Sequence, residues 1–141
     1  MKKICLILLV GCLMLLPGFA GAETADSKDI VTKIVRIRGY EGVAPLNIFI
    51  APGTVVVWLN QYHGEVKITF PQKKVTLACK SPVNFVVNDK GFFESRAVTF
   101  GAVASLCFVE QGTFEYFIER NPASLRAKSE GFRFEGKIVV K

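Results

Sequence analysis

The feature of this sequence that most constrains its fold is an alternation of apolar and polar residues with a period of two. It is clearest in KIVRIRG, PLNIFIAPG and EVKITFP, which are residues 33–39, 45–53 and 65–71. Successive side chains of a β-strand point to opposite faces, so each segment is expected to form a half-buried strand. Glycine and proline separate these segments, as is typical of turns. In a chain of 141 residues, this pattern predicts one all-β domain, an antiparallel sandwich or a small barrel.

Later segments extend the pattern. TVVVWLN (54–60) is apolar on both faces, NFVVNDKG (84–91) ends in a turn signal, and GKIVVK (136–141) closes the chain. We interpret SLCFVEQGTFEYFI (105–118) as a β-hairpin that turns at Gln111 and Gly112. Leu106 and Phe108 then point into the core, which turns Cys107 toward the outer face of its strand.

The first 22 residues have the pattern of a secretory signal peptide. A basic start, MKK, precedes an apolar run at 4–19 and the small residues of AGAE, so cleavage is expected after Ala22. The protein is therefore expected to be periplasmic or secreted. LVGC, ending at Cys12, also resembles a lipoprotein cleavage site, so a lipid anchor at Cys12 is a second interpretation. An uncleaved membrane anchor ranks third, because the apolar run is short for a span.

Removal of this segment limits the chemistry that is available. The remaining chain has one histidine, His63, two cysteines, Cys79 and Cys107, and no methionine. The formal net charge of +6 falls by two, because Lys2 and Lys3 leave and no acid leaves with them. This basic excess is mild and forms no run with interleaved aromatic residues, so no nucleic-acid partner is expected.

Three motifs resemble the cupredoxin family and occur in the family's order. PLNIFIAPGTVVVWLN resembles its Pro, Gly-turn and Val-x-Trp-x-Asn pattern; GTFEYFI resembles its Gly-Thr-Tyr-x-Tyr-x-Cys strand; FEGKIVV resembles its closing strand. The resemblance covers most of the chain from Pro45 to Lys141. It implies an all-β Greek-key antiparallel β-sandwich at 35–141, preceded by a leader and the start of the first strand at 23–34. It also implies single-electron transfer through a type 1 copper.

The family's copper ligands do not carry over to this sequence. The copper thiolate falls on Ile118, the second histidine on Asn121 and the axial methionine on Phe134. The first histidine falls on Gly64, beside His63. Because type 1 copper needs two imidazoles and a thiolate, we expect a degenerate site and no cofactor. Ile118 is expected to extend the core, and Glu65 to be solvated.

The two remaining cysteines are expected to form a disulfide. This is the simplest interpretation for an exported protein, with Cys79 in a long segment, 71–90, draped over the outside of the sandwich. A metal site that uses Cys79, Cys107 and His63 is the alternative interpretation. Ligand clusters usually show short spacings such as Cys-x-x-Cys, which are absent here.

The sequence therefore favours an exported binding or accessory domain, for which a redox-related system is the expected setting. No nucleophile with a histidine partner, no paired carboxylates and no phosphate loop indicate an enzyme. The alternative is a copper-binding or electron-transfer protein that uses His63 with Cys79 and Cys107, or with ligands from a partner.

A protein partner is expected at the loop before the last strand. This loop, 119–135, lies in the family at one end of the sandwich, beside the loop that follows Trp-x-Asn. The expected apolar contacts are Tyr62, Leu125 and Phe132, and the expected basic rim is Arg120, Arg126 and Arg133. The alternative interpretation is a solvated cap without a partner.

Overall fold

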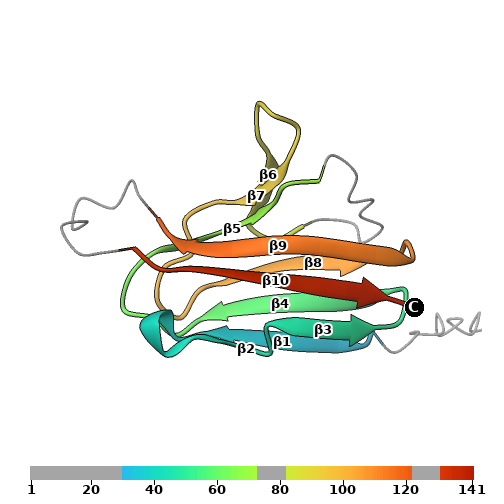
Figure 1. Cartoon of the computed structure of the whole chain (residues 1–141), viewed down its shortest axis with the longest axis horizontal. Helices are drawn as coiled ribbons and strands as arrows, with labels where there is room; N and C mark the ends of the chain where they lie inside the picture. Colours follow the sequence, from blue (N-terminus) through green and yellow to red (C-terminus); the bar gives the residue numbers. More distant parts are fainter. Residues whose placement is uncertain (1–29, 73–81, 122–130) are drawn as a thin grey trace, which may run out of the picture.

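The chain folds into two packed β-sheets, as Figure 1 shows. The structure is a computed structural model, and it describes residues 30–72, 82–121 and 131–141. Sheet A has the order β2-β1-β4-β8, and sheet B has the order β3-β10-β9-β5-β7-β6. Sheet A contains β1 (Thr32–Ile37), β2 (Val43–Ala44), β4 (Thr54–Asn60) and β8 (Val103–Phe108). Sheet B contains β3 (Asn47–Ile50), β5 (Val66–Phe70), β6 (Phe85–Val87), β7 (Phe93–Ser95), β9 (Gly112–Arg120) and β10 (Arg133–Val140).

The expected β-sandwich is confirmed, although its sheets are mixed rather than purely antiparallel. β1 runs parallel to β4, and β3 runs parallel to β10. The other strand pairs are antiparallel. A 3-10 turn, η1 (Gly39–Glu41), follows β1. Among the described residues, no helix has the length and apolar character needed to cross a membrane.

The predicted hairpin at 105–118 is wrong, because its two strands belong to different sheets. β8 pairs with β4 in sheet A, whereas β9 pairs with β10 and β5 in sheet B. The chain crosses from one sheet to the other through Val109–Gln111. Both strands still place alternate apolar side chains in the core, so Leu106 and Phe114 are buried as expected. Periodicity identifies the inner face of a strand but not the sheet to which the strand belongs.

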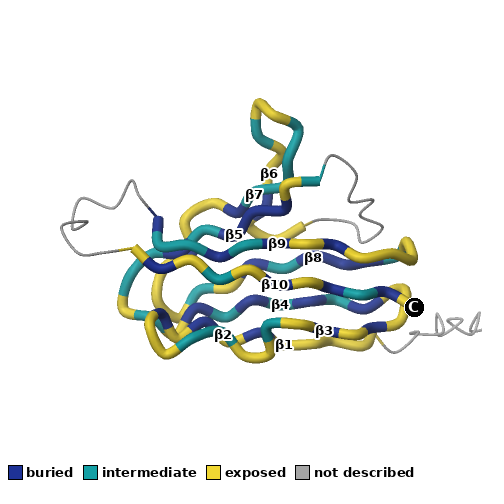
Figure 2. The backbone as a smooth tube through the Cα atoms, viewed as in Figure 1, coloured by how far each residue is buried: buried dark blue, intermediate teal, exposed yellow. Residues whose placement is uncertain are grey.

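The core lies between the sheets and is centred on Trp58 of β4 (Figure 2). The indole ring contacts Phe70, Phe85 and Tyr116, each with ring centroids 5.7 Å apart. The expectation that the whole segment 71–90 lies outside the sandwich is wrong for Phe85, because only 6% of this residue is exposed. β6 carries this residue and pairs with β7 at the border of sheet B. Residues 73–81, including Cys79, lie outside the described residues.

Tyr116 links three strands across the inner face of sheet B. It pairs in register with Gly136 of β10, and its hydroxyl donates a hydrogen bond of 2.8 Å to the carbonyl of Leu46, just before β3. The ring reaches that carbonyl because Gly136 has no side chain; a Cβ there would meet the Leu46 carbonyl oxygen and the Tyr116 ring. Burial raises the pKa of Tyr116 to about 12.

Candidate functional site

The four positions that correspond to copper ligands lie together at one end of the sandwich. Ile118 of β9 is opposite both Phe134 of β10 and Ile68 of β5. The backbone N–H of Asn121, just after β9, donates to the Glu65 carbonyl at 2.9 Å, next to Gly64. We call this region the loop end: η1, residues 61–65, the end of β9 and the start of β10. In Figure 1 it lies at the left, where β4 ends.

Tyr62 fills the space beside the position of the first histidine. Its ring lies between two glycine residues, Gly39 of η1 and Gly64, and a Cβ on either glycine would collide with it. Gly39 also has a backbone φ of 65°, which residues other than glycine rarely adopt. A histidine cannot replace Gly64 while the Tyr62 ring occupies this place. Glycine at position 64 is therefore part of the packing of Tyr62 and not merely an absent ligand.

Four aromatic rings, which we call the aromatic cluster, close the loop end. Phe132 lies at its centre, with ring centroids 5.4 Å from Tyr40, 5.2 Å from Tyr62 and 5.6 Å from Phe134. Only 8% of Phe132 is exposed, so it is a packing residue and not the surface contact that was expected. Tyr40 is 59% exposed and presents the cluster to solvent. Phe134, at the position of the axial methionine, is half-buried.

Asn60 fixes the loop that carries Tyr62 and His63. It is fully buried at the end of β4, and its Nδ2 donates to the carbonyls of Gly64 at 2.7 Å and Val98 at 2.8 Å. Its Oδ1 accepts a hydrogen bond of 2.8 Å from the N–H of Tyr62. Sequence reasoning did not single out this residue. The available signal was a polar residue at an inward position of an apolar strand, two residues after Trp58.

Asn121 is held by a hydrogen bond to a carboxylate. Its Nδ2 donates a hydrogen bond of 2.8 Å to the Oε2 atom of Glu65, and its exposed fraction is 9%. Glu65 is half-buried, so the expectation that it is solvated is wrong. The pair joins the end of β9 to the start of β5. An amide nitrogen that donates to a carboxylate offers no lone pair to a copper ion.

His63 lies on the surface of the loop end, away from Cys107. Its ring stacks on Phe100, with centroids 4.2 Å apart. An open pocket of about 390 Å³ borders it, lined by Arg38, Tyr40, Glu41, Gln61, Tyr62 and His63. Cys107 pairs with Val55, which lies at the opposite end of β4 from Asn60. At the usual strand rise, Val55 and Asn60 are about 17 Å apart. One ion cannot join His63 and Cys107 of a single chain, because two ligands of one metal lie within about 5 Å of each other.

Cys107 is on the outer face of β8, as expected from the sequence, but it is covered. It is 5% exposed and does not belong to the core cluster between the sheets. Val83 pairs with Ser105, which is two residues before Cys107 on β8. Val83 follows Cys79 by four residues in the sequence. Cys79 itself lies outside the described residues.

The described residues do not fit a type 1 copper. Within 30–72, 82–121 and 131–141, no group of three His, Cys, Asp or Glu side chains could hold a metal ion. At the loop end the positions of the ligands carry a glycine, an isoleucine, a hydrogen-bonded amide and a phenyl ring. None of these supplies the imidazole or thiolate donors that copper requires.

The predicted docking residues are only partly available to a partner. Arg133 is exposed, lies 3.2 Å from the Glu135 carboxylate and 3.8 Å from that of Glu119, and stacks over the Phe117 ring. Arg120 and Tyr62 are half-buried. Leu125 and Arg126 lie outside the described residues.

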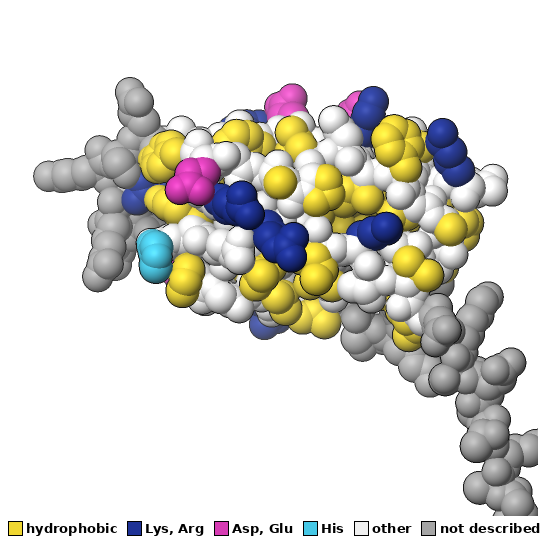
Figure 3. All heavy atoms as spheres, turned by 90° about the horizontal axis from the view of Figure 1, so that it is seen from below, with side chains coloured by type: hydrophobic (Ala, Val, Ile, Leu, Met, Phe, Trp, Pro, Cys, Tyr) yellow, Lys and Arg dark blue, Asp and Glu magenta, His cyan; other side chains and the backbone are white. Residues whose placement is uncertain are grey.

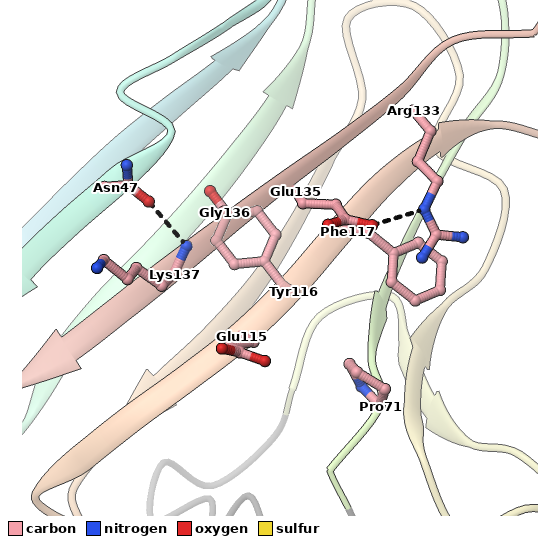
Figure 4. A pocket seen from close by; sticks show the side chains of 9 residues that line it. All are labelled: Asn47, Pro71, Glu115, Tyr116, Phe117, Arg133, Glu135, Gly136 and Lys137. Atoms are coloured by element: carbon pink, nitrogen blue, oxygen red, sulfur yellow. Dashed lines mark hydrogen bonds and ion pairs between the residues drawn. The ribbon is translucent and has the colours of Figure 1, made fainter.

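A second cavity lies on the outer face of β9 and β10 and reaches the start of β10 (Figure 4). It has a volume of about 430 Å³ and is lined by Asn47, Pro71, Glu115, Tyr116, Phe117, Arg133, Glu135, Gly136 and Lys137. Its charged side chains come from both signs, and Arg133 and Glu135 pair with each other. This surface is a solvated sheet face and does not indicate a particular ligand.

The chain matches no protein-family model and no curated protein. Its fold matches solved structures of amicyanin. A reduced amicyanin in which tryptophan is replaced by tyrosine has a TM-score of 0.52 and 18% identity, over 84% of this chain and 87% of that chain. Amicyanin from Paracoccus versutus has a TM-score of 0.51 and 18% identity, over 81% and 83%. A Cu(I) amicyanin with methionine replaced by alanine has a TM-score of 0.51 and 21% identity, over 87% and 90%. At these identities the likeness concerns the fold alone.

Proposed function

We propose that this domain, whose fold is cupredoxin-like, is a non-enzymatic binding or accessory module that does not carry a type 1 copper. The observation that carries the proposal is the Tyr62 ring, which lies between Gly39 and Gly64 and fills the place beside the first ligand position. The buried Ile118 and the hydrogen-bonded Asn121 support it further. The buried residues at the loop end pack against one another and hold no metal. The exposed surface above them is therefore available for a partner.

Titration of the purified protein with Cu(I) and Cu(II) tests this proposal. We expect no intense visible absorption from a copper–thiolate centre, because no thiolate and no imidazole pair lie at the loop end. A His63→Ala variant is the matched control, since weak Cu(II) binding to this exposed imidazole should disappear in it. An intense blue band that survives this substitution would contradict the proposal.

A copper-handling protein remains the second candidate function. His63 is exposed at the loop end, so it can supply one imidazole to an ion whose other ligands come from another molecule. Such a site should bind one copper for each pair of molecules. The stoichiometry of the same titration therefore separates the two candidates.

We further propose that the chain is exported to the periplasm or secreted, cleaved after Ala22, and closed by a Cys79–Cys107 disulfide. Two observations support the disulfide. Cys107 is not a free thiol, and Val83, which follows Cys79 by four residues, pairs with Ser105 near Cys107. The intact mass of the exported protein should correspond to a chain that begins at Glu23. Treatment with a thiol-alkylating reagent should leave this mass unchanged unless a reductant is added first. A lipid-bearing Cys12, or two alkylated thiols without reductant, would contradict this.

The loop end is the proposed docking surface of the module. Tyr40 is 59% exposed, and Arg120 and Arg133 lie nearby on the strands that end or begin there. Aromatic and arginine side chains are the residues that contribute most at protein interfaces. A photoreactive residue in place of Tyr40 reports on this surface in the cross-linking experiment given below.

A further inference from the structure

The outer face of sheet B is that of a solvated sheet. Its strands carry equal numbers of basic and acidic residues: Lys67, Arg120, Arg133 and Lys137 against Glu94, Glu115, Glu119 and Glu135. Several of these pair, including Lys67 with Glu94 at 2.6 Å. Burial raises the pKa of Glu94, but the hydrogen bonds from Lys67 and Asn88 outweigh it, so the pKa lies below its usual value.

The outer face of sheet A is different, because most of its outward positions are apolar, with Cys107 covered at one end. Three rows of outward positions cross β1, β4 and β8: Thr32, Val55, Cys107; Ile34, Val57, Ser105; and Arg36, Leu59, Val103. Val83 pairs beside Ser105. Ile34 is 45% exposed, Val83 45% and Val103 36%, and the valines and leucine of β4 are half-buried. We call this surface the apolar face.

The strands of sheet A carry basic residues and no acidic residue. Arg36 occupies an outward position of β1, whereas Lys33 lies in the register of the inward Val35. Arg38 follows directly after β1 and lines an open pocket with Glu41. Within the described part of the chain, Arg36 and Arg38 make no ion pair. Figure 3, which views the molecule from below, shows a line of Lys and Arg side chains beside hydrophobic side chains, with an acidic side chain at one end of the line.

We propose that the apolar face is a second docking surface, and that it binds a protein whose own apolar patch is bordered by carboxylates. An apolar sheet face that is open to solvent marks an interaction site. Charge complementarity decides the occupant: carboxylates of a partner would pair with Arg36 and Arg38, which make no ion pair with the residues that the structure describes.

A second copy of the chain fits this surface poorly. The copy would present an apolar face without an acid, so each Arg36 would be left unpaired and desolvated.

A lipid surface fits less well than a protein, because interfacial apolar groups penetrate about 5–10 Å into a bilayer. On this face Val55, Val57 and Leu59 of β4 are half-buried among their neighbours.

Photo-cross-linking in the native host, with the full chain, tests the proposal. A photoreactive phenylalanine derivative replaces Ile34 on the apolar face, Tyr40 at the loop end, or Glu115 on sheet B as the control. We expect a protein adduct from position 34 and none from position 115. Charge reversal by Arg36→Glu and Arg38→Glu should reduce the adduct at position 34 about tenfold, whereas Lys137→Glu on sheet B should not. Unchanged unfolding temperatures show that the variants fold.

Each other outcome overturns the inference. An adduct with a second copy of the chain, an adduct with lipid, or no adduct at position 34 would each show that the apolar face does not bind a protein of this kind. A protein adduct at position 34 that survives charge reversal would remove the role of the carboxylates. An adduct at position 40 alone would leave the proposed docking at the loop end intact and overturn only the second surface.

Discussion

Replacement of Gly136 by alanine should lower the free energy of unfolding by about 3 kcal/mol, at the upper end of the usual cost of overpacking. The added Cβ would meet the Leu46 carbonyl oxygen and lie 2.8 Å from Cζ of Tyr116. A carbonyl of the backbone cannot move aside as a flexible side chain can. Tyr116 would also lose the space through which its hydroxyl reaches Leu46. Chemical denaturation measures the change.

Gly131→Ala is the matched control for this substitution. Gly131 stands five residues earlier in the same chain segment, and a Cβ there would have no atom within 4 Å. Its replacement should change stability by no more than about 0.5 kcal/mol. Equal stability of the Gly136→Ala and Gly131→Ala variants would show that the packing of Tyr116 against Gly136 is not as described.

Gly64→Ala should destabilise the loop end by about 2 kcal/mol, because its Cβ collides with the Tyr62 ring. Tyr62→Ala alone should also be destabilising, since it removes the ring from the aromatic cluster. The double variant should be more stable than the sum of the two changes predicts, by about 1–2 kcal/mol, because the collision is absent when the ring is absent.

This double-mutant cycle decides whether Gly64 is fixed by packing. Additive effects of the two substitutions would mean that the ring and the glycine do not interact, and the account of the missing histidine would fail. The same cycle with Gly39→Ala should show a similar coupling but leave the double variant less stable than Tyr62→Ala alone. Gly39 has a φ of 65°, so alanine is strained there even after the ring has been removed.

The sequence predicts faces of strands well and partners of strands poorly. Val35, Ile37, Ile48 and Ile50 are buried as their alternation indicates, and so is Ile118. The assignment of β8 and β9 to one hairpin failed, because two consecutive strands with apolar inner faces can pair with each other or face each other across the core. The burial of Phe85 was missed for a related reason: three consecutive apolar residues, Phe85, Val86 and Val87, show no alternation that marks which of them points inward.

The resemblance to the cupredoxin family predicted where the candidate site lies. It did not predict which contacts its residues make. The motifs bring Gly64, Ile118, Asn121 and Phe134 to one end of the sandwich. They do not indicate that Tyr62 lies between two glycines or that Phe132 is buried. Such contacts join residues that are distant in sequence, as with Gly39, Tyr62 and Phe132, and no local pattern encodes them. The hydrogen bond between Asn121 and Glu65 is of the same kind.

The three hydrogen bonds of Asn60 have a consequence for the kinetics and entropy of recognition. They hold the backbone of residues 61–64 in one arrangement before any partner arrives. A partner that docks on Tyr40 and Tyr62 therefore finds a preorganised surface, and association does not incur the conformational entropy of ordering that loop. Binding at the loop end should proceed without a slow rearrangement step, so differences in affinity among partners should arise in their dissociation rates.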